Sequence, residues 1–192
     1  SMLRTRATDN TAFVAYNNMV GGQDELVFDG DSLVFDETGN IIARGAQFEE
    51  DLVVVDLDLG GVRCSRAKDF SHVQSVDSRE TPVVSIPALR SDKTLLPEVE
   101  IREPLAADSE VYRALVVGTR DYVGKNRFKK VVIGLSGGID SALTAIVAVD
   151  ALGSSNVVGV SMPSKFSSEG SVEDSKTLAR RLGIELMTIP IR

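Results

Sequence analysis

Short apolar runs separated by turn residues characterise the first 60 residues of the chain. The runs stand at residues 11–19, 25–28, 32–35 and 41–44. Gly30 and Asp31 predict a turn between the second and third runs, and residues 36–40 (DETGN) predict a hairpin turn before the fourth. Residues 51–59 (DLVVVDLDL) change from continuously apolar to alternating, as expected of a strand that leaves the core. The pattern therefore predicts β-strands throughout this part.

Residues 62–107 carry little sustained periodicity. They are polar and contain Pro82, Pro87, Pro97 and Pro104. The segment is typical of a connector that crosses a surface, with short extended pieces such as residues 83–86. Because a connector of this length is unusual inside one compact domain, the segment favours a domain boundary. We expect one domain in residues 1–61, a connector in 62–107 and a second domain in 108–192.

Helical and strand patterns alternate regularly after the connector. The periodicity predicts helices at residues 108–124, 140–152 and 172–182, and strands at 130–135, 156–162 and 184–191. Gly153 and Gly183 fit the ends of the second and third helices, and Ser171 with Asp174 has capping-box spacing at the start of the third. Alternating strands and helices predict a parallel sheet. A third parallel strand without a following helix leaves an apolar face open, so we expect a piece of a larger domain.

Composition excludes several classes of protein. The chain of 192 residues is 43% hydrophobic and 26% charged, as in ordinary globular proteins. No apolar run approaches the length of a membrane span. The net charge of −7 argues against a broad nucleic-acid surface, which needs clustered cations. Cys64 is the single cysteine and cannot form an internal disulfide, so we expect a cytoplasmic protein without nucleic-acid or membrane partners.

Residues 131–141 (VVIGLSGGIDS) place a loop of small residues between a buried strand and an apolar helix. Gly137 and Gly138 can adopt backbone angles closed to other residues and let the backbone approach an anion. The start of the following helix presents unpaired N–H groups and the positive end of the helix dipole. Ser136 and Ser141 add hydroxyl donors. The pattern predicts a phosphate-binding loop, and the structural alternative is a tight turn with a serine cap and no ligand.

Asp140 could cap the helix or hold a Mg²⁺ ion that neutralises phosphates. The common nucleotide motif G-x-x-x-x-G-K-[ST] and the dinucleotide motif G-x-G-x-x-G are both absent. The remaining pattern, S-G-G-x-D-S after a strand, resembles the ATP pyrophosphatases, which implies ATP as the ligand and Mg²⁺ as its metal. The residues expected at the ATP site are Gly134, Leu135, Ser136, Gly137, Gly138, Ile139, Asp140, Ser141, Met162 and Lys165.

Residues 161–170 (SMPSKFSSEG) form a second candidate segment after the next strand. Ligands of open α/β sheets bind beyond the carboxyl ends of the strands, where this segment begins. Lys165 could reach a phosphate, and the backbone of Met162 and Pro163 could flank an adenine. The alternative is a solvated serine-rich loop that caps the next helix.

These residues together resemble the glutamine-dependent NAD synthetases. Residues 131–153 and 157–184 are similar to the opening of their synthetase domain, and residues 15–45 are similar to the closing strands of their nitrilase-type glutaminase domain. The implied fold class is α/β. It comprises the closing β-strands of a nitrilase-like α/β sandwich, followed by a partial Rossmann-like parallel ATP-pyrophosphatase domain.

The resemblance implies a reaction. The family's synthetase domain uses ATP and Mg²⁺ to adenylate deamido-NAD, and ammonia then displaces AMP to give NAD. The glutaminase domain supplies the ammonia from glutamine through an internal tunnel. The loop matching Gly134–Ser141 cradles the ATP phosphates, and the aspartate matching Asp140 binds Mg²⁺. The resemblance also implies a homo-oligomer at full length.

The resemblance assigns no catalytic residue to this chain. The family's glutaminase cysteine, glutamate and lysine lie N-terminal to its first residue, and Cys64, in GVRCSRAKD, matches no such motif. We therefore expect neither glutaminase activity nor complete synthetase activity from the chain alone. Two alternatives remain. One is another ATP-pyrophosphatase enzyme, such as an amidotransferase making guanylate or asparagine, or a tRNA-thiolating or sulfate-reducing relative. The other is a non-catalytic unit for ATP binding or assembly.

Several further polar residues have both a functional and a structural interpretation. They are Gln23–Glu25, the pair Asp29 and Asp31, His72, and Lys129 with Lys130. The first group could lie near a glutaminase pocket or form a turn, with equal weight. A metal or acid–base role is conceivable for the carboxylate pair, but a polar turn is favoured. The histidine is expected to be solvated, and the lysines to begin a strand rather than contact phosphate.

Overall fold

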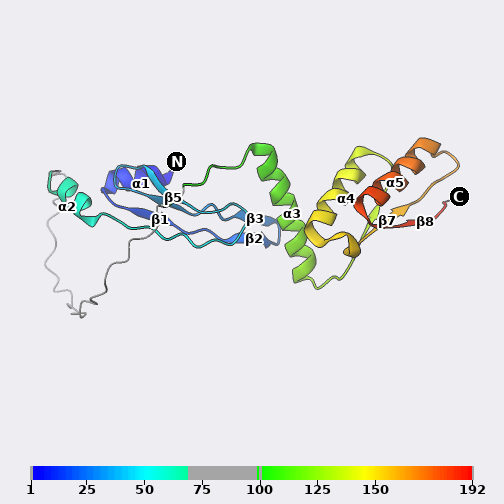
Figure 1. The fold of residues 1–192 in the computed structure, drawn as a ribbon, viewed down its shortest axis with the longest axis horizontal. Helices are drawn as coiled ribbons and strands as arrows, with labels where there is room; N and C mark the ends of the chain where they lie inside the picture. Colours follow the sequence, from blue (N-terminus) through cyan, green and yellow to red (C-terminus); the bar gives the residue numbers. More distant parts are fainter. Residues whose placement is uncertain (1, 69–98, 100, 192) are drawn as a thin grey trace. The chain divides into compact units, whose positions relative to one another are not determined.

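The computed structural model describes residues 2–68, 99 and 101–191 (Figure 1). The chain divides into two compact units, each built from segments distant in the sequence. The first unit draws on residues 1–17, 31–46 and 51–103, and the second on 18–30, 47–50 and 104–192. None of the described helices is long and apolar enough to cross a membrane. The predictions for residues 83–86 and His72 lie outside the described residues.

The first unit contains an antiparallel sheet with strand order β1-β4-β5. Its elements are α1 (Met2–Asn10), β1 (Val14–Tyr16), β4 (Leu33–Phe35), β5 (Ile41–Arg44) and α2 (Leu59–Lys68). The predicted hairpin between β4 and β5 is confirmed. In its turn the Asp36 carboxylate accepts the N–H groups of Thr38 at 2.9 Å and Asn40 at 2.8 Å. Phe35 and Ala7, which are 1% and 0% exposed, belong to the core of this unit.

The prediction of β-strands throughout the N-terminal part is wrong at two places. Residues 2–10 form helix α1, whose polar sequence has a single buried side chain and therefore no apolar periodicity to reveal it. Residues 51–58 form no strand. The carboxylate of Asp51 accepts the N–H groups of Ala46 at 2.9 Å and Leu52 at 2.8 Å. This side chain closes a local turn, which competes with pairing in a sheet.

Helix α2 begins where the predicted strand was expected to end. Asp58 accepts the N–H groups of Gly60 at 2.9 Å and Gly61 at 3.3 Å through one carboxylate oxygen. Such bonds satisfy the unpaired donors of a helix N-terminus. The Asp-Leu-Gly-Gly sequence therefore begins a helix, and Cys64 lies exposed on it.

The second unit combines a hairpin from the N-terminal part with the alternating C-terminal elements. Its hairpin strands are β2 (Val20–Gln23) and β3 (Leu26–Asp29), and its helices are α3 (Ala107–Lys125), α4 (Ile139–Leu152), the 3₁₀ turn η2 (Ser154–Asn156) and α5 (Glu169–Leu182). Strand β3 pairs with β2, not with the strand that follows the turn at Gly30. Figure 1 shows α3 between the hairpin and α4, and α3 contacts both of them.

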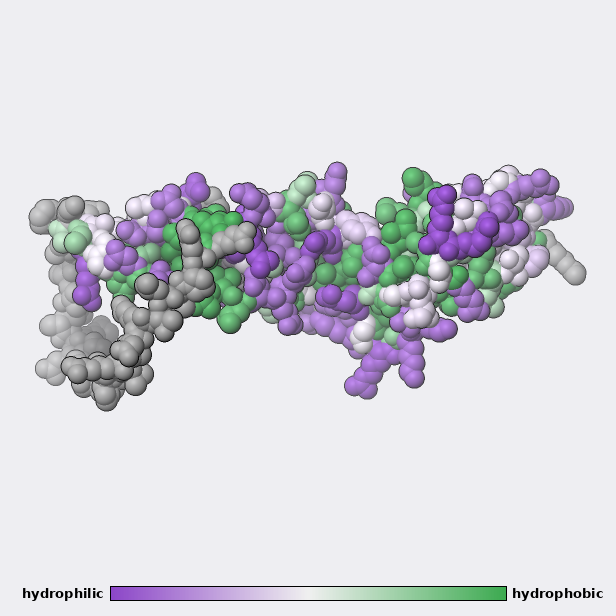
Figure 2. All heavy atoms as spheres, in the orientation of Figure 1, coloured by the Kyte–Doolittle hydropathy of each residue, from purple (hydrophilic) through white to green (hydrophobic). Residues whose placement is uncertain are grey.

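The predicted parallel sheet is confirmed. Strands β6 (Val131–Gly134), β7 (Val157–Ser161) and β8 (Glu185–Thr188) lie in that order, all parallel. The buried core residues beside the sheet are Leu135, Ala145, Ala148, Val157, Ala179 and Ile184. Figure 2 shows mostly hydrophobic residues over α4 and mostly hydrophilic ones over α5. On the strands, Val132 and Met187 are 69% and 48% exposed, so apolar side chains of the sheet remain open to solvent.

Helix α5 starts earlier than predicted. It begins at Glu169, and Ser168 is its N-cap, whose hydroxyl accepts the N–H of Ser171 at 3.1 Å. The capping box expected for Ser171 and Asp174 is therefore wrong, because the preceding serine already caps the helix. Its C-terminus agrees with the prediction, since Gly183 adopts a left-handed conformation with φ of 68°.

Candidate functional site

The loop between β6 and α4 passes very close to the start of α5. Gly137 has φ of +80°, and a Cβ at this residue would lie 2.5 Å from the carbonyl oxygen of Ser171. Both the backbone angle and the lack of space require glycine here. The next residue, Gly138, is the N-cap of α4 and has extended backbone angles. The predicted small-residue loop therefore exists, and its first glycine is required by contact with a neighbouring helix.

Two serine hydroxyls brace the loop from inside. The Oγ atoms of Ser136 and Ser141 lie 3.2 Å apart. Ser136 Oγ also accepts the N–H of Gly138 at 3.2 Å, and Ser141 Oγ donates to the carbonyl of Gly138 at 3.0 Å. These bonds join the two ends of the S-G-G-x-D-S motif. The loop is therefore held in a folded shape by its own side chains.

The start of α4 presents the features of an anion site. Its N-cap, Gly138, makes no side-chain capping hydrogen bond, whereas Ser168 caps α5. A helix without a side-chain cap leaves N–H groups available to a ligand, and the helix dipole favours a negative charge there. Asp140 stands exposed in the first turn, and the side chain of Ile139 is 84% exposed. The surface at this helix start is open.

The second candidate segment leaves the same edge of the sheet. Gly134 is in register with Val160, so the loops after β6 and β7 begin side by side. The Sδ-bound methyl carbon of Met162 lies 3.6 Å from where a Gly134 Cβ would stand. Lys165 instead lies over the ring of Phe166, with 5.0 Å between its Nζ and the ring centroid. The structure therefore brings Met162 to Gly134 at the end of β6, and it places the ammonium of Lys165 over the ring of Phe166.

Two serines of α5 support the loop, and the sequence reasoning missed both in this role. Ser175 is 1% exposed. Its hydroxyl lies 3.3 Å from the carbonyl oxygen of Leu135 and 2.9 Å from that of Ser171. A usable signal was present, because Ser171, Ser175 and Ala179 are small residues at helical i, i+4, i+8 spacing. Such a row lets a helix approach another backbone closely.

The metal prediction rests on one carboxylate. The described part of the chain contains no group of three or more metal-ligating side chains. Mg²⁺ usually keeps several water ligands and is bound by one or two carboxylates together with phosphate oxygens. The exposed carboxylate of Asp140, beside an uncapped helix start, therefore fits the metal of a nucleotide complex.

The carboxylate pair considered from the sequence has structural partners. Asp31 forms a two-pronged ion pair with Arg44, with distances of 2.6 and 2.8 Å. Asp29 accepts a hydrogen bond from the side-chain amide of Asn18 at 2.9 Å. These contacts agree with the favoured structural interpretation.

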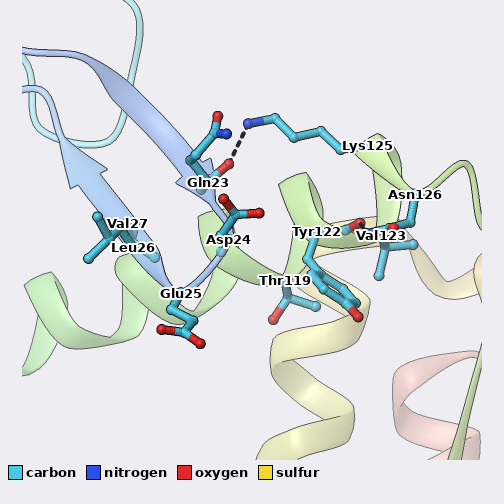
Figure 3. A pocket seen from close by; sticks show the side chains of 12 residues that line it. Gln23, Asp24, Glu25, Leu26, Val27, Thr119, Tyr122, Val123, Lys125 and Asn126 are labelled. Atoms are coloured by element: carbon cyan, nitrogen blue, oxygen red, sulfur yellow. Dashed lines mark hydrogen bonds between the residues drawn. The ribbon is translucent and has the colours of Figure 1, made fainter.

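Residues 23–25 lie at the tip of the β2–β3 hairpin, where they line a pocket of about 480 Å³ with residues of α3 (Figure 3). Asp24 has φ of 52°, as turn residues often do. The turn interpretation of this segment is therefore confirmed. Lys129 and Lys130 are exposed ahead of β6, as a solvated strand start would be.

Comparison with known protein families finds two matches on this chain. The carbon-nitrogen hydrolase family matches residues 1–67, and the NAD synthase family matches residues 111–192. Glutamine-dependent NAD(+) synthetase of Aquifex aeolicus is 50% identical over 192 residues, which are 100% of this chain and 34% of that protein. The enzyme of the same name from Thermotoga maritima is 47% identical over 190 residues, 98% of this chain and 33% of that protein.

A solved structure has the same fold. Glutamine-dependent NAD+ synthetase from Acinetobacter baumannii, in complex with adenosine diphosphate, matches 100% of this chain and 30% of its own with a TM-score of 0.77 and 35% identity. The chain spans about a third of the length of these relatives. The order of the two family matches, with identity along the whole chain, shows that it belongs to the glutamine-dependent NAD⁺ synthetase family.

Proposed function

We propose that this chain carries the ATP phosphate loop of a glutamine-dependent NAD⁺ synthetase, together with the region where its hydrolase and synthase parts join. In this proposal residues 1–61 belong to the hydrolase part, 62–107 to a connector and 108–192 to the synthase part. The observation that carries the proposal is the loop geometry: Gly137 pressed against α5, followed by an uncapped start of α4. The relative solved with ADP, which aligns with the entire chain, supports a nucleotide as the ligand.

The proposed role of this chain is to bind and orient ATP. The N–H groups at the start of α4 would face the phosphates, with Ser136 and Ser141 as additional donors. The backbone beside Met162 would flank the adenine, and Lys165 would reach a phosphate by leaving the Phe166 ring. Asp140 would hold Mg²⁺, which neutralises phosphate charge when bound. Fixed donors aimed at the leaving pyrophosphate stabilise the negative charge that it gains in the transition state.

The proposed reaction has two steps. A carboxylate oxygen of deamido-NAD attacks the α-phosphorus of ATP, and the bond to pyrophosphate breaks. Ammonia then attacks the acyl carbon and expels AMP, so that the carboxylate becomes the amide of NAD⁺. Glutamine is the proposed ammonia source, in line with the names of the relatives. We propose that the chain alone binds ATP without completing either step, and that the full-length enzyme is a cytoplasmic homo-oligomer.

Calorimetric titration with Mg-ATP tests this proposal. The variants are Ser136→Ala with Asp140→Ala, and a matched control, Ser155→Ala with Asp174→Ala, which removes the same side chains from exposed positions elsewhere. We expect saturable binding by the unchanged chain and the control, and at least about tenfold weaker binding by the loop variant, since charge-assisted contacts are each worth about 1.5–3 kcal/mol. Equal affinities in all three proteins would refute the assignment of the loop.

A further inference from the structure

Helix α3 makes contacts on two faces, and both faces belong to the second unit. Toward α4, the hydroxyl of Tyr112 donates to Asp150 at 2.5 Å. Leu115 and Leu143 line an apolar pocket of about 370 Å³ on the same side. Helix α4 starts directly after the phosphate loop. One face of α3 is therefore packed against the helix that presents the proposed ATP site.

The other face of α3 holds the β2–β3 hairpin by the backbone of one residue. The Asp121 carboxylate accepts the N–H of Gly22 at 2.8 Å. The ammonium of Lys125 donates to the carbonyl of the same residue (Figure 3). Asp121 and Lys125 are one helical turn apart, so they point to the same side of α3. Strands of a two-stranded sheet have outer edges with unpaired backbone groups. Two charged side chains satisfy that edge at Gly22.

Glycines let the hairpin and the helix approach closely. A Cβ at Gly22 would lie 3.2 Å from the Cα of Gly118 and 3.3 Å from the Cβ of Asp121. A Cβ at Gly118 would lie 3.1 Å from a methyl group of Val27. Gly21, with φ of +128°, would bring a Cβ to 2.7 Å from a carboxylate oxygen of Asp121. The junction between the β2–β3 hairpin and α3, formed by Gly21, Gly22, Gly118, Asp121 and Lys125, therefore depends on close approach of the two backbones.

The charged groups at the junction favour the ionised form of the Asp121 carboxylate. Burial raises the pKa of Asp121, but the hydrogen bonds from Gly22 and Arg120 and the positive charges of Arg120 and Lys125 outweigh it and hold the pKa below its usual value. The carboxylate is thus kept in its acceptor form. Hydrogen bonds to charged groups contribute more than neutral ones.

A second segment from the N-terminal part contacts the same region. Glu49 pairs with Arg113 on α3 at 2.8 Å. The side-chain oxygen of Gln47 accepts the N–H of Leu105 at 2.7 Å, just ahead of α3. The neighbouring Phe48 is 6% exposed. Residues 18–30 and 47–50 therefore both pack with the C-terminal part, although the carbon-nitrogen hydrolase family matches them.

We propose that Asp121 and Lys125 are positioning residues that hold the hydrolase part in register with the synthase part. The inference rests on the proposed function. Hydrolysis of the glutamine amide by water gives glutamate and ammonia, and that ammonia must reach the adenylate before it escapes to solvent. Helix α3 contacts the β2–β3 hairpin on one face and α4, the helix after the phosphate loop, on the other. In the proposed role these contacts keep the hydrolase part in register with the synthase part. Neither residue contacts substrate in this role.

The test measures NAD⁺ and glutamate formed by the protein at the full length of its relatives. The variant is Asp121→Ala with Lys125→Met, and the control is Asp108→Ala with Lys129→Met, which removes the same charges near the two ends of α3 but outside the junction. We expect the variant to make NAD⁺ from ammonium chloride within about twofold of the unchanged rate. With glutamine as donor we expect NAD⁺ formation to fall about tenfold. A fall of this size corresponds to the loss of charged hydrogen bonds at one contact. The ratio of glutamate to NAD⁺ rises correspondingly.

The ratio separates positioning from a loss of folding, since unfolding lowers both activities together. If the double variant loses both, Lys125→Met decides by the same ratio, with Lys125→Arg, which keeps a donor, expected to restore it. A ratio equal to that of the unchanged protein would overturn the inference and leave the proposed function intact. If the unchanged protein makes no NAD⁺ even from ammonium chloride, the proposed function itself fails.

Discussion

The hydroxyl of Ser175, buried in α5, lies 3.3 Å from the carbonyl oxygen of Leu135 and donates to it. Leu135 is the first residue after β6, and the small-residue loop that contains Gly137 follows it directly. The same hydroxyl lies 2.9 Å from the carbonyl of Ser171, whose backbone presses on Gly137. The Ser175 side chain of α5 thus contacts Leu135, just before the loop, and Ser171, the residue that the loop approaches at Gly137.

Replacement of Ser175 by alanine should therefore destabilise the second unit. The change leaves the Leu135 carbonyl without this donor in a buried position, which costs about 1–3 kcal/mol. Urea denaturation measures the loss, and Ser155→Ala, at an exposed serine of η2, is the matched control. Equal unfolding free energies for the two variants would show that the hydrogen bond from Ser175 does not stabilise the folded protein.

The close approach at Gly137 can be separated from its backbone strain. Gly137→Ala introduces a Cβ at 2.5 Å from a carbonyl oxygen at φ of +80°. Gly153→Ala provides the control, because its φ is +81° but a Cβ there would meet nothing within 4 Å. We expect the control to lose about 1–3 kcal/mol of unfolding free energy, from strain alone. Gly137→Ala should lose more, and should also weaken Mg-ATP binding.

Thermal or chemical denaturation of the two glycine variants, with calorimetric titration of each, makes the comparison. Similar losses in both, with unchanged ATP affinity, would contradict the account of a loop pressed against α5.

The link between α3 and α4 predicts a pH dependence. The hydrogen bond to Asp150, with burial and the negative charge of that residue, raises the pKa of Tyr112 from 10.0 to about 12. Because the folded pKa lies above the unfolded one, the stabilisation is complete below pH 10 and is lost as the pH rises toward 12. Titration by tyrosinate absorbance should assign an apparent pKa near this value to Tyr112, identified by comparison with Tyr112→Phe.

Asp150→Asn should lower the pKa of Tyr112, since it removes the charge while keeping a similar shape. An unchanged titration curve in this variant would mean that the bond does not persist in solution.

The C-terminal part was predictable from the sequence for a physical reason. Buried parallel strands and their covering helices leave different apolar periods, and glycines such as Gly153 and Gly183 mark where helices end. The small-residue loop at residues 136–138 was predictable because its glycines and serine stand at a strand-to-helix transition, whereas its phosphate-binding role stays a prediction. Helix α1 was not, since a helix with one buried side chain leaves no periodic signal.

Contacts between distant segments were the other limit. No local pattern indicates that Gly22 meets Asp121 and Lys125, because these residues are far apart along the chain and meet only through tertiary packing. The prediction of a strand at residues 51–59 was wrong for a different, local reason, since the Asp51 side chain closes a turn with neighbouring backbone groups. Side-chain bonds to backbone override the strand tendency of the residues beside them.

Amide hydrogen exchange with and without Mg-ATP tests the central claim most directly. The account predicts that the nucleotide slows exchange of the amides of residues 137–141, at the loop and the start of α4. The amides at the start of α5, where Ser168 already caps the helix, should change less. ATP binding that leaves exchange at residues 137–141 unaltered would contradict the claim that this loop holds the phosphates.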